Sequence, residues 1–204
     1  MALGAGAVVL GGLALYFVFG RRKQAGSFIV GGKLVPSAAP VLSWEATGMG
    51  FPDLKDRKAT RGVVLHYSGS AQATTQSIYN TLVERKLSVQ LALGRDGVFA
   101  QYCDLNKRAV HANEANADFI GIEIASDGQS YTPEQIRSLL QGLSAILGAY
   151  GLPWRVPKRD GKVVTGTLTS AEFQAFKGIL AHYMIAADKN DPGVALMQKV
   201  AAVA

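Results

Sequence analysis

The sequence has few of the residues that mark several large classes of protein. A single cysteine, Cys103, among 204 residues excludes an internal disulfide framework, but it fits an exported protein without bridges as well as a reducing compartment. No Lys- or Arg-rich run is interleaved with aromatic residues, which argues against nucleic acid as a partner. Internal repeats are absent, and the 49% hydrophobic content predicts one compact folded domain. The net charge of +6 suits polyanions such as anionic lipid or acidic envelope polymers.

The longest stretch without charge lies at the N-terminus. Residues 2–20 carry no charge, and Arg21, Arg22 and Lys23 follow directly. About 19 residues at a rise of about 1.5 Å come close to the roughly 30 Å hydrocarbon core of a bilayer. We therefore predict a transmembrane helix with a basic flank over residues 1–24. We therefore expect a membrane-anchored protein. Its location would be the bacterial inner membrane or periplasm, or a phage particle.

Two other interpretations of this stretch are a cleaved signal peptide and a buried core helix. A signal peptide usually carries its positive charge before the apolar residues, whereas here the charge follows them. Residues 25–58 then shift to Gly, Pro, Ser and Ala without a persistent helical or strand period. This composition predicts a linker, or an extended arm packed on the domain.

Strand patterns begin near Ala59. Gly62–His66 and Phe119–Ala125 are apolar, β-branched runs typical of buried strands. Two further runs, Ser88–Leu93 and Val98–Tyr102, flank an Asp-Gly pair that indicates a hairpin turn.

Helical patterns alternate with these strands. Thr74–Arg85 has apolar residues at helical spacing, and Thr132 to Gln135 combine a capping box with proline at the first helical position. The helix that follows carries an apolar stripe as far as Tyr150 and ends at Gly151. The sequence therefore predicts an α/β domain over residues 59–204, with a central mixed β-sheet flanked by helices.

Four segments in a fixed order carry a resemblance to a known family. They are GVVLHYSGS at residues 62–70, GRDGVFAQYCDLNKRAVHAN at 94–113, IGIEIA at 120–125 and AHYMIAADKNDPG at 181–193. In this order the chain resembles the zinc-dependent N-acetylmuramoyl-L-alanine amidases of the type-2 family. That family shares its fold with bacteriophage amidase-type lysozymes and peptidoglycan recognition proteins. The resemblance does not extend to the apolar stretch or the arm.

The resemblance implies a zinc site. His66, His182 and Asp191 match the positions of the three metal ligands, and two imidazoles with one carboxylate leave the fourth position of Zn²⁺ for water or substrate. Taken singly, His66 suits a core histidine at a strand end and His182 suits a residue on a helix surface. The three together, in the expected order, favour the metal.

Three further residues receive roles from the same resemblance. Glu123 matches the carboxylate that moves the proton, although strand alternation also permits a solvent-facing residue. Lys189 matches a lysine that faces the oxyanion; otherwise it is a loop lysine. His111 lies where the family has a Trp-His-Ala segment, with Val110 in place of the tryptophan. We expect His111 to bind substrate rather than metal, with a surface histidine as the alternative.

The function that follows is cleavage of the amide between N-acetylmuramic acid and L-alanine in peptidoglycan, by a phage endolysin or a virion-associated lysin. A peptidoglycan-binding module without turnover and a structural component of a phage particle are the alternatives. The partners expected are peptidoglycan, a membrane through residues 2–20, and either a second copy of the chain or virion proteins.

Overall fold

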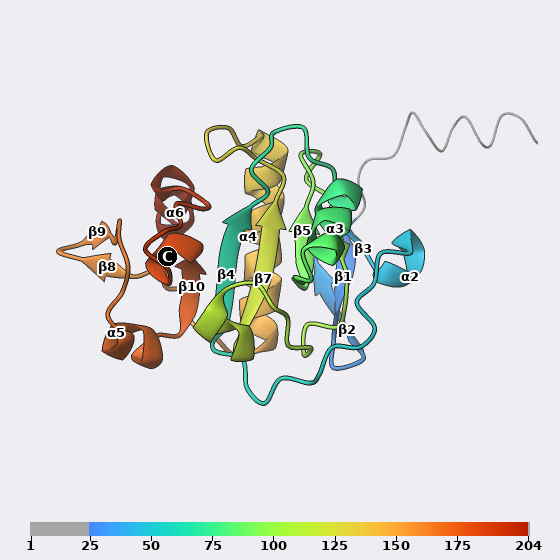
Figure 1. The fold of residues 1–204 in the computed structure, drawn as a ribbon, viewed down its shortest axis with the longest axis horizontal. Coiled ribbons are helices and arrows are strands. Elements are labelled where there is room, and N and C mark those ends of the chain that lie inside the picture. The colour runs from blue at the N-terminus through green and yellow to red at the C-terminus, as the bar shows by residue number, and fades with distance from the viewer. Residues whose placement is uncertain (1–24, 204) are drawn as a thin grey trace, which may run out of the picture.

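The computed structural model describes residues 25–203, and a six-stranded sheet forms its centre (Figure 1). Across the sheet, the strands lie in the order β10 (Gly178–Ala181), β4 (Gly62–Tyr67), β7 (Phe119–Ile124), β5 (Leu91–Leu93), β6 (Phe99–Gln101) and β3 (Val41–Leu42). The first four are parallel, β6 is antiparallel to β5, and β3 is parallel to β6. The predicted α/β fold with a central mixed sheet is confirmed.

Helices cover both faces of this sheet (Figure 1). Helix α4 (Pro133–Ala149) lies on one face and buries Leu139, Leu143 and Ile146 in the main hydrophobic cluster. Helix α3 (Thr75–Glu84) lies on the other face and contributes Ile78 and Leu82 to a second, smaller cluster. Each such side chain, when fully buried, contributes about 1.5–3 kcal/mol. The sheet is therefore held from both sides.

The start of α4 follows from its sequence. The Thr132 side chain accepts a hydrogen bond from the Gln135 amide, and the Gln135 side chain accepts one from the Thr132 amide. Pro133 occupies the first turn, where its missing N–H costs nothing. The predicted capping box is confirmed.

The close approach of β10 to β4 depends on a glycine. A Cβ atom at Gly62 would lie 1.8 Å from the carbonyl oxygen of Gly178, so no larger residue fits there. The two strands are parallel and in register, with Ala181 beside Leu65. The residues that follow, His182 and His66, therefore emerge side by side at the carboxyl end of the sheet.

The segment from residue 25 to 58 contains regular structure that its composition did not indicate. Strands β1 (Gly26–Val30) and β2 (Lys33–Ser37) form an antiparallel hairpin, and β3 joins the edge of the central sheet. A short helix, α2 (Trp44–Thr47), follows. The division of the chain near residues 24 and 58 stays a prediction.

The C-terminal part adds small elements beside β10 (Figure 1). These are the hairpin of β8 (Lys158–Arg159) and β9 (Lys162–Val163), α5 (Ser170–Ala175) and α6 (Val194–Ala201). Two short 3₁₀ helices, η1 (Asn113–Ala117) and η2 (His182–Met184), complete the fold.

The expected membrane anchoring needs correction. Within residues 25–203 we find no helix with the length and apolar character that crossing a bilayer requires. That finding overturns the localisation inferred from the sequence. The transmembrane helix predicted within residues 1–24 lies outside the described residues.

Candidate metal centre and catalytic pocket

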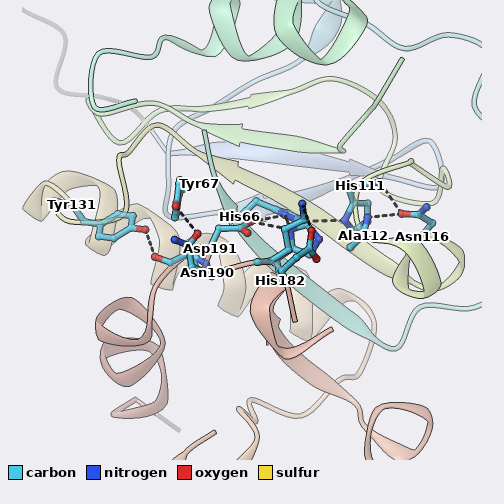
Figure 2. A network of polar contacts seen from close by, with 12 residues as sticks. His66, Tyr67, His111, Ala112, Asn116, Tyr131, His182, Asn190 and Asp191 are labelled. Atoms are coloured by element: carbon cyan, nitrogen blue, oxygen red, sulfur yellow. Dashed lines mark hydrogen bonds and ion pairs between the residues drawn. The ribbon is translucent and has the colours of Figure 1, made fainter. Parts of the chain in front are cut away.

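Three side chains from different parts of the chain converge at the carboxyl end of the sheet (Figure 2). His66 comes from the end of β4, His182 directly follows β10, and Asp191 lies in the loop before α6. The Nδ1 atom of His66 lies 3.1 Å from Nδ1 of His182 and 3.0 Å from Oδ2 of Asp191. The Nδ1 atom of His182 lies 3.1 Å from the same carboxylate oxygen. The structure thus brings together the three residues proposed as metal ligands.

The loop that carries Asp191 is held by several hydrogen bonds. The Tyr183 amide donates to the carbonyl oxygen of Asp191 at 3.2 Å. The Tyr67 hydroxyl donates to Oδ1 of Asn190 at 2.7 Å, and the Tyr131 hydroxyl donates to the carbonyl oxygen of Pro192 (Figure 2). We did not predict Tyr67, Tyr131 or Asn190, and no local pattern distinguishes them from other polar residues.

Burial controls the charge of the three residues. His66 is 2% exposed and Asp191 8% exposed. Burial lowers the pKa of His66, with a further lowering by His182, although the contact to Asp191 opposes both. Burial alone would raise the pKa of the Asp191 carboxyl, but its contacts to His182 and His66 outweigh burial and hold that pKa below its ordinary value. At neutral pH His66 is neutral and Asp191 ionised.

This donor set fits a zinc ion. The three ligand atoms lie within 4.8 Å of one another. Tetrahedral zinc with bonds of 2.0–2.2 Å keeps its donors about 3.3 Å apart, close to the separations observed here. Neutral imidazole nitrogen and ionised carboxylate oxygen are the forms in which these residues bind zinc.

Glu123 stands beside this group on the neighbouring strand. It pairs with His66 across β4 and β7, so both side chains lie on the same face of the sheet. Its Oε2 atom is buried and has no hydrogen-bond partner among residues 25–203. Burial, together with the negative charge of Asp191, raises the pKa of Glu123 to about 8. A carboxyl group of this kind can hold a proton near neutral pH and give it up to a suitable acceptor.

A pocket opens next to Glu123, between the loop after β4 and helix α3. Its volume is about 280 Å³. Ile78 and Leu82 of α3 supply apolar surface, whereas Ser70 and Arg85 are among its polar lining residues. A polar substrate segment could therefore lie within reach of Glu123.

Lys189 lies on the loop between His182 and Asp191. Its Nζ atom lies 3.1 Å from Oδ2 of Asp188, in an exposed ion pair, and the Lys189 side chain is 40% exposed. This pair is the one ion pair that Lys189 forms within residues 25–203. The structure does not bring its ammonium group onto the three ligands, and the oxyanion role stays a prediction.

His111 lies on the far side of His66 from the convergence of the three ligands (Figure 2). Its Nδ1 atom lies 3.0 Å from Nε2 of His66, and its Nε2 atom lies 3.2 Å from the carbonyl oxygen of Phe119. Burial, and then the neighbouring His66, lowers the pKa of His111 well below its ordinary value. His111 does not line the pocket beside Glu123. Its expected role in substrate binding stays a prediction.

Comparisons with known proteins agree with this geometry. A profile of the family described as N-acetylmuramoyl-L-alanine amidase (Amidase_2) matches residues 56–194. No protein with curated function matches the chain.

Several solved structures have a similar fold. One is the N-acetylmuramoyl-L-alanine amidase LysC from Clostridium intestinale URNW, at 19% identity and a TM-score of 0.54, over 75% of this chain and 88% of that one. Another is the Ph2119 endolysin of a Thermus scotoductus bacteriophage, at 15% identity and a TM-score of 0.55, over 79% of this chain and 99% of that one. A third is Drosophila PGRP-LB, at 16% identity and a TM-score of 0.56, over 78% of this chain and 91% of that one. At these identities the similarity shows a shared fold.

Proposed function

Since the chain belongs to the N-acetylmuramoyl-L-alanine amidase family, we propose that it is a zinc-dependent peptidoglycan hydrolase. The bond cleaved is the amide between the lactyl group of N-acetylmuramic acid and L-alanine. The observation that supports this most strongly is the convergence of His66, His182 and Asp191, whose ligand atoms lie 3.0–3.1 Å apart.

These three residues would hold the zinc ion. When bound, zinc polarises a carbonyl oxygen and lowers the pKa of water. His66 and His182 are neutral ligands and Asp191 contributes one negative charge, so the loaded site keeps a net positive charge. That charge favours the negative oxygen that develops when an amide carbonyl is attacked.

Glu123 would move the proton. An attacking water must lose a proton, and the leaving amine of L-alanine must gain one. The raised pKa of Glu123, about 8, belongs to the chain without metal, and a nearby cation lowers it. Burial thus raises the pKa of Glu123 above its ordinary value, and the cation brings it back down toward neutrality. A carboxyl group with a pKa in that range can accept and then donate a proton at neutral pH.

Lys189 would stabilise the oxyanion. For this its ammonium group must leave the exposed pair with Asp188, which is held at 3.1 Å. Surface pairs of this kind contribute at most about 1 kcal/mol, so the rearrangement costs little.

The biological context that we propose is an endolysin or a virion-associated lysin of a phage. The support is the shared fold with the Ph2119 endolysin, almost all of whose length is matched. A peptidoglycan-binding module without turnover is the rival, because Drosophila Peptidoglycan Recognition Protein SA also shares this fold, at 15% identity and a TM-score of 0.56.

The experiment is digestion of purified peptidoglycan, with the products identified chemically. An amidase of this specificity releases new α-amino groups of L-alanine and no new reducing sugar ends. We expect this release to stop on chelation and to return with added zinc. Binding to peptidoglycan without release of amino groups would establish the binding module instead. New reducing ends would show a glycosidase and contradict the proposal.

A further inference from the structure

Both ring nitrogens of His66 have close neighbours. Nδ1 faces His182 and Asp191, whereas Nε2 lies 3.0 Å from Nδ1 of His111. The planes of the two imidazoles, His66 and His111, are nearly perpendicular, at 89°. A contact of this length between two imidazole nitrogens requires that one carry the hydrogen and the other a lone pair.

The direction of that hydrogen bond follows from a backbone carbonyl. The oxygen of Phe119 can only accept, and it lies 3.2 Å from Nε2 of His111. Nε2 of His111 therefore carries the hydrogen. In the neutral ring, Nδ1 of His111 is left with the lone pair, so it accepts from Nε2 of His66. The hydrogen of His66 then sits on Nε2, and Nδ1 presents its lone pair to His182 and Asp191.

His111 is fixed in this position by the chain around it. The side-chain oxygen of Asn116 accepts hydrogen bonds at 2.7 Å from the amides of both His111 and Ala112. The imidazole of His111 also packs directly over Gly121 of β7. A Cβ atom at Gly121 would lie 2.8 Å from Cγ of His111, so a larger residue would displace the ring.

We propose that His111 is a positioning residue, which selects the tautomer of His66 that presents the Nδ1 lone pair to the metal. This inference rests on the proposed zinc site, in which His66 is one of the three ligands. Partners on the second nitrogen of a metal-binding histidine typically fix its tautomer and orientation. Usually the partner is a carboxylate, a backbone carbonyl or water. Here a histidine stands between the ligand and the carbonyl of Phe119.

A pair of variants of similar size separates hydrogen bonding from packing. In His111→Asn the side-chain oxygen is bonded to Cγ, as Nδ1 is in histidine, and can accept from His66. In His111→Leu the space is filled but no acceptor remains. We expect His111→Leu to weaken zinc binding about 10- to 100-fold, the usual effect of removing such a partner. His111→Asn should bind zinc nearly as tightly as the native chain.

The hydrogen bond itself can be observed in the native chain. The sequence has only three histidines, so the imidazole nitrogens can be assigned by nitrogen-15 NMR with single variants. In the zinc-loaded protein we expect a proton on Nε2 of His66 and a nitrogen–nitrogen coupling across the bond to Nδ1 of His111. This measurement does not depend on whether His111→Leu folds.

The outcomes are distinct. A proton found on Nδ1 of His111 would overturn the proposal, and so would zinc binding by His111→Asn as weak as that of His111→Leu. If the native chain binds no zinc, the proposed function fails. In that case the position of the proton between His66 and His111 still tests the hydrogen bond in the metal-free protein.

Discussion

The ligand side of the site and its pocket side differ in whether their polar atoms have close polar neighbours within the protein. On the ligand side, formed by His66, His182, Asp191 and His111, the side chains are within 3.2 Å of polar partners. On the pocket side, Oε2 of Glu123 has no partner among residues 25–203 and stands beside an open pocket.

This difference indicates two separate tasks. A set of side chains that already contact one another needs little rearrangement to hold a metal ion. A buried oxygen without a partner costs free energy, and such groups are typical of places where a missing partner arrives during function. The ligand side therefore suits binding of the ion, and the pocket side suits the arrival of water and substrate.

The sharpest way to break the comparison is to remove one of the proposed metal ligands. We expect Asp191→Ala to abolish zinc binding and to lower amidase activity by about 10³-fold or more. Metal ions contribute several kcal/mol to stabilising charge in the transition state, and each 1.36 kcal/mol is a factor of ten. The measurement is zinc content after dialysis together with release of alanine amino groups.

Asp188→Ala is the matched control for that experiment. Asp188 lies on the same loop, but its side chain is 74% exposed and pairs with Lys189 rather than with the histidines. We expect it to keep its zinc. Equal loss of zinc in both variants would show that the loop as a whole, rather than the Asp191 carboxylate, holds the ion.

A change on the pocket side should separate chemistry from metal binding. We expect Glu123→Gln to keep zinc but to lower the turnover rate by at least about 10²-fold, the usual scale for a positioned acid or base. Glu114→Gln, an exposed residue of η1, serves as the control. If Glu123→Gln loses zinc as well, the pocket side also contributes to metal binding. The two sides then do not have separate tasks.

A smaller effect is expected at Lys189. Loss of a buried oxyanion donor costs about 10²–10³-fold, but Lys189 is exposed and paired, so we expect about tenfold for Lys189→Ala. The loss should appear in kcat and leave zinc binding unchanged. Lys177→Ala, also exposed, is the control. If the activity of Lys189→Ala equals that of the control, Lys189 is a loop lysine with no role in catalysis.

Much of the sheet could be predicted because its strands carry local signals. The β5–β6 hairpin follows from Asp96-Gly97, and α4 begins where Thr132 and Gln135 cap it. By contrast, β3 has two residues and cannot show a period. Its place at the edge of the sheet follows from pairing with β6, a contact between residues about 58 positions apart in the sequence.

The site also has features that the sequence predicts and features that depend on contacts between distant residues. The resemblance supplied His66, His182 and Asp191, and the structure brings them together. The contact between His66 and His111 joins residues 45 positions apart and depends on Gly121 leaving room for the ring. No local pattern encodes such a contact. The same holds for the partial burial of Glu123, because alternation along β7 does not show which face α3 covers.

The smallest effect that we predict concerns stability and pH in the metal-free protein. The Glu123 carboxyl has a pKa of about 8 in the folded chain, against an ordinary value of 4.5. Between these values the folded state holds more protons than the unfolded state, so the free energy of unfolding falls as the pH rises. His66 and His111 act in the opposite direction, because their folded pKa values are lowered from the ordinary value of 6.5. In the unfolded chain these two imidazoles have lost nearly all of their protons about one pH unit above that value, at about pH 7.5. The range from about pH 7.5 to 8.5 therefore reports mainly on Glu123.

Urea unfolding of the metal-free protein across that range measures this slope. One titrating proton changes the free energy of unfolding by at most about 1.4 kcal/mol per pH unit, and we expect less because Glu123 is only half-buried. Glu123→Gln should remove the slope, since glutamine does not titrate. A slope of the same size in Glu123→Gln as in the native chain would mean that the Glu123 carboxyl does not titrate in this range and is already ionised. Oε2 of Glu123 would then need no arriving partner, and the division of tasks between the two sides would not hold.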